Sequence, residues 1–522
     1  MRSIILTAGL VALPLALSEG GHAARVEGGD GPGALIDRGI AQRWKAEGVK
    51  GAALADDYEF FRRLSIDLRG VIPTAEEVRA FAADRDPAQR ERIVDAWLRS
   101  EEFARAWGRR WSDDLAINNP LKAKFRQAFD AFEGWVRDAV RANMPYDRFA
   151  RRLLTAKGPL DLDPAAGFLM SGLAMSNEGP KDVVERAGRI FLGTQIRCAE
   201  CHDHPFDDWT QEDFYSMAGF FWQSRAEIRS SKDSSSFNGW IVDDPAKGEP
   251  FVASAKEKKS FAASYKGTGE GPGEREPRRT AFARLLVADP QFARAAVNRH
   301  WGMLVGRGFV HPLDGFGAAK KPSHPELLDA LAADFARSGY DVRRLMKAIL
   351  LSQPYQLSSR RPDASPDRLF ARALAVPLSP EQLYESLVRA TGLQDQRLPT
   401  QTKGDPRDLR EAFLREFRPP YEQPDPFAAP AEATISQALF FLNGSAVNLA
   451  VKAALRPKKG AVAETDPARR LEELYLSILS RPPSARESQL LLKRIEARGG
   501  SPEAYEDVVW ALLNSTEFVT RH

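Results

Sequence analysis

The sequence predicts a mainly α-helical protein built from two helical domains. Signals that begin and end helices recur along the chain, whereas the alternating apolar and polar pattern of strands is nearly absent. A chain of 522 residues is also long enough to bury more than one hydrophobic core. A stretch rich in glycine, serine, lysine and proline interrupts the helical signals near the middle and is expected to join the two domains.

The first residues have the pattern of a secretory signal peptide. Arg2 gives a basic start, residues 4–17 are apolar, and small residues follow up to Ala23. The apolar run is short for a membrane span. We therefore assign residues 1–23 to a signal peptide and expect an exported protein, periplasmic or secreted, with no transmembrane segment after cleavage. An uncleaved anchor is the alternative.

Helix signals dominate residues 35–225, the predicted first domain. Thr74 and Glu77 have the spacing of a capping box, and Asp86 is expected to cap the next helix. The helix that begins at Ser100 carries an apolar residue at every fourth position, which is more typical of core packing than of a cofactor site. This stripe comprises Phe103, Trp107, Trp111 and Leu115.

Residues 226–278 form the predicted linker between the domains. Their glycine, serine, lysine and proline content argues against a helix. We expect a short β-hairpin around Trp240 to Val252.

The predicted second domain covers residues 279–522 and continues the helical pattern. Ser323 and Glu326 have capping-box spacing. Ser379 is expected to begin a helix that ends at Gly392.

Two stretches of the chain resemble each other. Residues 63–107 and 474–521 both contain an apolar helix, a proline turn, a second helix and a "Ser-x-Glu-Phe" helix start. This similarity favours two related helical units, although no function follows from it.

The charge balance gives no sign of a nucleic-acid partner. The chain has 74 Lys and Arg against 71 Asp and Glu, a formal net charge of +3. Recognition of nucleic acid needs a concentrated basic face. Charges of both signs alternate almost everywhere, which is typical of solvated helix faces.

The strongest functional signal is the stretch "RCAECHDHPFDDW" at 197–209. It holds both cysteines of the chain, Cys198 and Cys201, with His202 directly after them. A secreted protein that relied on disulfides would carry more cysteines. C-x-x-C-H is the attachment motif of c-type haem, in which two thiols add to the haem vinyl groups and the histidine binds the iron. The sequence therefore predicts one covalently attached haem c.

The second axial ligand of the iron is less clear from the sequence. Met217 is a weak candidate, because it shares a helix face with Phe214 and Phe221 and fits a core position better. His300 and His311 are candidates from the second domain.

Other chemistries use the same residues. The two cysteines and His202 or His204, with Asp207 or Asp208, could bind zinc or another transition metal without haem. The cysteines could also form a redox-active or structural disulfide. A local cluster without function is the remaining alternative.

Several stretches together resemble a known family. "DYEFFRRLSIDLRGVIPTAEEVRAF", "GTQIRCAECHDHPFDDWTQEDFYSMAGFF" and "NRHWGMLVGRGFVHPLDGFGAAKKPSHPELLDALAADF" are similar to planctomycete-type cytochrome-c-like secreted proteins. The resemblance covers nearly all of residues 35–522. It implies an exported protein with two adjoining domains of unknown function.

Three functions follow as hypotheses. The first is an exported haem protein with an electron-transfer or haem-linked redox role and an extracytoplasmic redox or surface-protein partner. The second is an extracytoplasmic helical scaffold in which the cysteines form a metal or disulfide clip. A third hypothesis is an enzyme whose second domain is catalytic. Helix-surface polarity and capping explain its candidate residues more simply; these are Asn298, Arg299, His300, Arg307 and His311.

Overall fold

The computed structural model is mainly helical, which confirms the predicted fold class. The predicted signal peptide, residues 1–23, lies outside the residues that the structure describes. Those residues are 31–116, 126–174, 179–230, 237–243, 251–252, 260–317, 320–360, 365–393, 409–417, 441–442, 444–456 and 465–522. No helix in these ranges is both long and apolar enough to cross a membrane.

Most helices pack around one large hydrophobic core, which takes residues from both sides of the predicted linker 226–278. The linker therefore separates two stretches of sequence but not two hydrophobic cores. The helices of this part are α1 (Pro32–Glu47), α2 (Asp57–Arg69), α3 (Ala75–Ala83), α4 (Gln89–Leu98), α5 (Glu101–Ala116), α6 (Arg126–Arg141), α7 (Tyr146–Thr155), α8 (Gly167–Leu173), α9 (Pro180–Ala187), α10 (Gln211–Gly219), α11 (Arg278–Ala288), α12 (Pro290–Val305), α13 (Pro325–Arg337), α14 (Val342–Leu351) and α15 (Gln353–Gln356).

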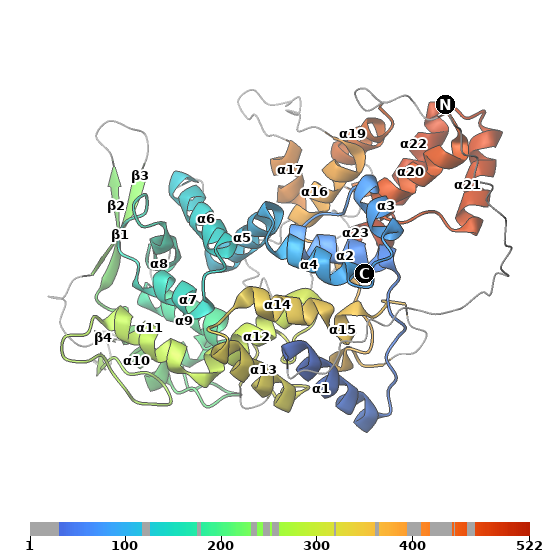
Figure 1. Cartoon of the computed structure of the whole chain (residues 1–522). Coiled ribbons are helices and arrows are strands. Elements are labelled where there is room, and N and C mark those ends of the chain that lie inside the picture. Colours follow the sequence, from blue (N-terminus) through green and yellow to red (C-terminus); the bar gives the residue numbers. More distant parts are fainter. Residues whose placement is uncertain are drawn as a thin grey trace, which may run out of the picture.

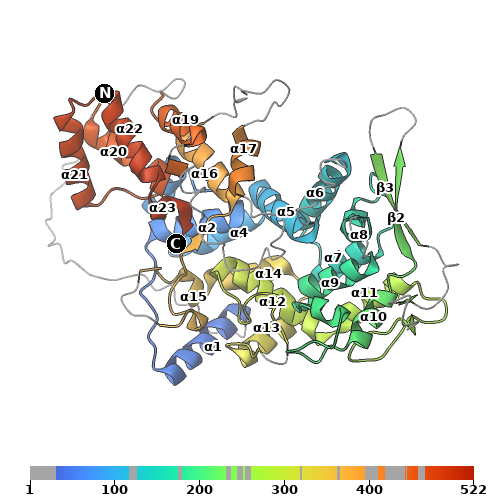
Figure 2. The same ribbon diagram turned by 180° about the vertical axis from the view of Figure 1, so that it is seen from behind.

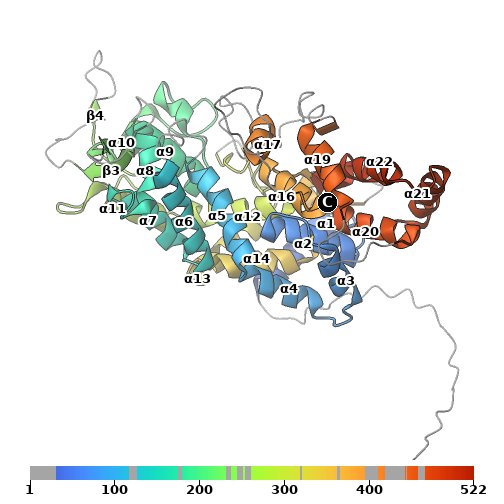
Figure 3. The same cartoon turned by 90° about the horizontal axis from the view of Figure 1, so that it is seen from above.

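A second, smaller core lies in the C-terminal part. The β-hairpin and α21 lie at opposite ends of the molecule (Figures 1, 2 and 3). The helices of the second core are α16 (Pro380–Thr391), α17 (Leu409–Phe417), α19 (Ser445–Ala454), α20 (Pro467–Leu479), α21 (Ala485–Ala497), α22 (Pro502–Leu513) and α23 (Thr516–Val519).

A hairpin forms at Trp240, but the predicted pairing of the Trp240 strand with that of Val252 is wrong. Strands β2 and β3 pair antiparallel, with Glu227 opposite Trp240, and β1 pairs with the other edge of β3. Val252 lies on β4, which pairs with β5 instead of with the strand of Trp240. The strands are β1 (Gly158–Pro159), β2 (Ser224–Ser230), β3 (Phe237–Asp243), β4 (Phe251–Val252), β5 (Ser260–Phe261), β6 (Val376–Pro377) and β7 (Thr520–Arg521).

Helix α2 belongs to both cores and is buried on every side. Leu64 and Leu68 pack into the large core, whereas Ile66 packs into the small one. Its charged residues from Glu59 to Arg69 are buried as well, so the interpretation of alternating charges as solvated helix faces is wrong for this helix. Burial of charges is tolerated because each charged side chain has partners.

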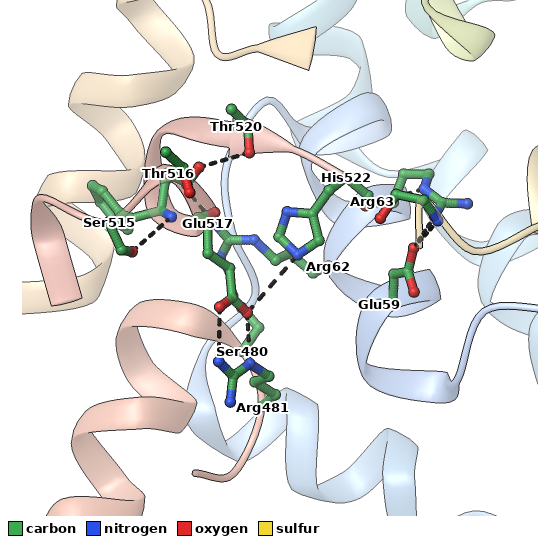
Figure 4. Close-up of polar contacts among 12 residues, drawn as sticks. Glu59, Arg62, Arg63, Ser480, Arg481, Ser515, Thr516, Glu517, Thr520 and His522 are labelled. Carbon is green, nitrogen blue, oxygen red and sulfur yellow. Dashed lines mark hydrogen bonds and ion pairs between the residues drawn. The ribbon is translucent and has the colours of Figure 1, made fainter. Parts of the chain in front are cut away.

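Several partners of the α2 charges come from the C-terminal end of the chain (Figure 4). Arg62 donates to the main-chain oxygens of Ile478 and Phe518, each at 3.1 Å. Arg63 donates to the main-chain oxygen of His522 at 3.1 Å. The C-terminus consequently lies beside α2 in the middle of the molecule (Figure 1).

The two stretches that resemble each other in sequence, residues 63–107 and 474–521, also have the same pattern of internal ion pairs. In each, one arginine binds the glutamate of a capping box and the glutamate of a "Ser-x-Glu-Phe" helix start. The first helix of each ends at a residue with left-handed φ, Gly70 or Ser480. The ion-pair residues are Arg69, Glu77 and Glu102 in the first unit and Arg481, Glu487 and Glu517 in the second.

Most predicted helix caps are confirmed, and two are wrong. Thr74 forms its capping box with Glu77. Ser323 does not cap α13, because its hydroxyl contacts the ring of His324 and that helix has no side-chain cap. Asp86 lies before the first residue of α4 and accepts a hydrogen bond from Ala88 N instead.

Replacing Arg62 by methionine is expected to destabilise the fold strongly. Arg62 is buried, and its loss leaves the carbonyls of Ile478, Glu517 and Phe518 without their donor. We expect a loss of about 3 kcal/mol in the free energy of unfolding, measured by urea denaturation. The control is Arg79→Met, which removes an exposed ion pair with Glu473. Equal losses for both variants would contradict this account of α2.

The ion pair between Arg481 and Glu487, in the unit of residues 474–521, should make the stability of the protein depend on pH. Arg481 holds the pKa of Glu487 at about 2, below its usual 4.5. The lowered pKa contributes stability above pH 4.5 that is lost as the pH falls towards 2. The melting temperatures of wild type and Arg481→Gln should therefore converge as the pH falls through this window.

The matched control is Arg498→Gln, which breaks an exposed ion pair with Asp507. The difference in melting temperature between Arg498→Gln and wild type should change less over the same pH range. If the difference in melting temperature between Arg481→Gln and wild type stayed constant over this pH range, the ion pair between Arg481 and Glu487 would be contradicted.

Candidate functional site

The C-x-x-C-H motif lies in the loop between α9 and α10. The π-helical turn η3 (Gly188–Leu192) ends at Gly193, whose φ of 65° reverses the chain direction. The 3-10 turn η4 (Arg197–Glu200) then carries the first cysteine. His204 N donates to Trp209 O at 2.7 Å, which closes the loop before α10 begins.

Glu200 fastens this loop to the helices on either side. Its carboxylate forms ion pairs with Lys181 of α9 at 2.7 Å and with Arg197 at 2.8 Å. Its main-chain oxygen accepts hydrogen bonds from Tyr215 Oη and Gln211 Nε2 of α10, each at 3.1 Å. The motif is therefore held at a defined position between two helices.

The reactive side chains of the motif face solvent. Cys198, Cys201 and His202 are exposed, whereas Ala199 between the cysteines is buried in the large core. The two thiols are not bonded to each other. His202 Nδ1 lies 2.8 Å from the main-chain oxygen of Asp203, so a proton on Nδ1 is donated there and Nε2 keeps its lone pair.

These residues fit the attachment of haem c. Cys198 lies on the 3-10 turn, and Cys201 is the residue that follows the end of this turn. Residues three apart on such a turn lie on the same side. Both sulfurs are accessible for thioether formation, and the imidazole has one nitrogen anchored and the other available to iron.

The structure does not assemble the alternative zinc site. Among the residues that the structure describes, no three His, Cys, Asp or Glu side chains are placed to share a metal ion. His204 Nδ1 accepts a hydrogen bond from Phe206 N at 3.2 Å. Asp207 accepts one from Asp208 N, and the Asp208 carboxylate lies 3.6 Å from Lys266 Nζ.

The candidate second axial ligands lie in separate places. Met217 is buried in the large core on α10. His300 is fully buried on α12, stacked on Trp107 with ring centroids 6.0 Å apart. His311 is half-buried in the segment after α12. The structure gives none of the three a described contact with His202.

The interpretation of residues 298–300 as helix surface is wrong. Asn298, Arg299 and His300 are all buried in the described structure. Arg299 donates to the main-chain oxygen of Arg189 at 2.8 Å. It also lies near Asp114, whose pKa burial raises to about 6. Their packing inside the core explains these polar residues as parts of a structural network.

Sequence reasoning missed Asp314, which anchors the motif loop to the second half of the chain. Asp314 is fully buried and binds Arg189 Nε at 2.9 Å and Gln195 Nε2 at 2.9 Å. Phe316 N donates to Gly193 O at 2.9 Å beside it. An acidic residue within "PLDGFG" reads as an ordinary turn, so its partners more than 100 residues away could not be identified from local pattern.

Comparisons with known proteins divide the chain at a similar place. Residues 35–226 match the PSCyt2 family, described as a protein of unknown function (DUF1549). Residues 278–409 match the PSD1 family, also described as a protein of unknown function (DUF1553). The chain therefore carries two adjoining domains of these families. No curated protein and no solved structure matches it.

Replacing Asp314 by asparagine should loosen the motif loop. Arg189, which is half-buried, loses the closer of its two described carboxylate partners and keeps Glu185 at 3.7 Å, so the loop should open more readily. We expect amide hydrogen exchange of residues 193–209 to become at least about tenfold faster, measured by mass spectrometry.

The control for this variant is Asp367→Asn, which weakens an exposed ion pair with Arg372. It should leave exchange in the loop unchanged. Unchanged loop exchange in Asp314→Asn would show that Asp314 does not anchor the motif.

Proposed function

We propose that this chain, with its two adjoining domains of unknown function, is an exported c-type haem protein with an electron-transfer role. Cys198 and Cys201 would hold the haem through thioether bonds, and His202 would supply a nitrogen ligand to its iron. When bound, the haem supplies one-electron oxidation and reduction. The partner is an extracytoplasmic redox protein. The leader-like residues 1–23 support export, because c-type attachment takes place outside the cytoplasm.

The accessibility of both sulfurs, one on the 3-10 turn and one directly after it, carries this proposal. A thiol must reach a vinyl group to react, and Cys198 and Cys201 are both exposed and unbridged. The attachment of Glu200 to α9 and α10 keeps the turn in place. A zinc clip is less well supported, because the described residues bring no third ligand to the cysteines.

The protein's own residues have separate tasks in this function. The main-chain oxygen of Asp203 holds the Nδ1 proton of His202, which fixes the tautomer and leaves Nε2 for the metal. The exposed position of the motif lets a partner approach closely. Phe206, 76% exposed four residues after His202, offers an apolar contact for that partner.

The test is maturation of the full chain in a host with cytochrome c maturation machinery. We expect the mass of one haem on the purified protein and a Soret band that survives acid–acetone extraction. Cys198→Ser combined with Cys201→Ser should abolish both signals. His202→Ala should keep the covalent haem and change its spectrum. The control His204→Ala, two residues later, should leave mass and spectrum unchanged.

Three results would contradict the proposal. They are a colourless product with both thiols free, stoichiometric zinc on the cysteines, or a disulfide between Cys198 and Cys201. The last two would favour the scaffold with a metal or disulfide clip.

A further inference from the structure

A cavity of about 500 Å³ lies beside the motif loop. Residues on both sides of the motif line it, Leu192 and Thr194 before the cysteines and Trp209 after them. The opposite wall comes from Phe316 and its neighbours in the second family domain. Neither cysteine nor His202 lines the cavity, so it is a separate site from the predicted haem attachment.

One side of the cavity is apolar. Leu192, Trp209, Met217 and Phe316 line it, and all four side chains are largely buried. Such a wall favours the apolar body of a ligand, since ligand sites combine mostly apolar surface with a few placed polar groups.

Two positive charges at the cavity have no acidic partner within the described residues. Lys320 and Lys321 line the cavity, and neither forms an ion pair with a described carboxylate. The other two cations are engaged, because Lys266 Nζ lies 3.2 Å from Asp213 and Arg294 Nε lies 2.9 Å from Asp329.

Three carboxylates line the cavity, those of Asp207, Asp208 and Asp289, and none forms an ion pair with Lys320 or Lys321. The Asp208 carboxylate lies 3.6 Å from Lys266 Nζ. Asp289 accepts hydrogen bonds from Tyr265 Oη at 3.0 Å and from Gln291 N at 2.8 Å. The Asp207 carboxylate is packed against Gly317, where an added Cβ would meet it at 2.4 Å. The cavity thus combines an apolar wall with two exposed ammonium groups that form no ion pair with a described carboxylate.

We propose that this cavity binds a small organic acid. Lys320 and Lys321 hold its acid group, and its apolar body lies against the wall that contains Trp209 and Phe316. The site requires neither cysteine, so it goes beyond the haem proposal and stands without it.

The test is calorimetric titration of the full chain with three probes. Benzoate carries both an acid group and an apolar ring, sulfate carries charge alone, and benzyl alcohol carries the ring alone. We expect saturable binding of benzoate, weaker binding of sulfate and no detectable binding of benzyl alcohol. The double variant Lys320→Gln with Lys321→Gln should bind benzoate at least about tenfold more weakly.

The matched control is Lys45→Gln with Lys50→Gln, which removes the same charge from exposed positions outside the cavity lining. It should bind benzoate as wild type does, and melting curves of both double variants verify that they fold. Absence of saturable benzoate binding, or equal binding by both double variants, would overturn the proposal. Sulfate binding as tight as benzoate binding would overturn the role of the apolar wall.

A further experiment tests whether benzoate binding is independent of haem attachment. Protein with Cys198→Ser and Cys201→Ser should still bind benzoate, whether or not wild type carries haem. If haem-free protein binds benzoate and haem-loaded protein does not, the cavity belongs to the haem site and the separate acid site is wrong.

Discussion

The structure depends on the burial of the charged helix α2 between two hydrophobic cores. A helix that buries every face must satisfy its charges internally, because an isolated buried charge is very costly. Arg62 donates hydrogen bonds to carbonyl groups at the end of α20 and in α23. Asp67 forms an ion pair with Arg521, with 3.1 Å between nitrogen and oxygen. The last residues of the chain therefore complete the environment of a helix near its beginning.

This arrangement ties the parts of the molecule together. The large core joins both family-matched regions, α2 joins that core to the small one, and Asp314 joins the motif loop to the second region. The motif residues stay exposed on this frame, fixed by main-chain and carboxylate contacts. A rigid surface loop with accessible sulfurs suits covalent attachment of a cofactor and approach of a partner.

Local signals predicted the local features. The capping box at Thr74, the helix start at Ser379, the helical class and the C-x-x-C-H motif all depend on residues within a few positions of each other. The burial of Arg62 and the role of Asp314 depend on partners more than 100 residues away, so the sequence near them looks like ordinary polar helix or turn. The cavity beside the motif could not be predicted for the same reason, because its walls come from segments far apart in the sequence.

The central claim is that the buried charges of α2 make the two cores one cooperative unit. Differential scanning calorimetry of the full chain tests it most directly. The account predicts a single unfolding transition whose calorimetric and van't Hoff enthalpies agree. Two separate transitions, with the C-terminal helices melting before the rest, would contradict it.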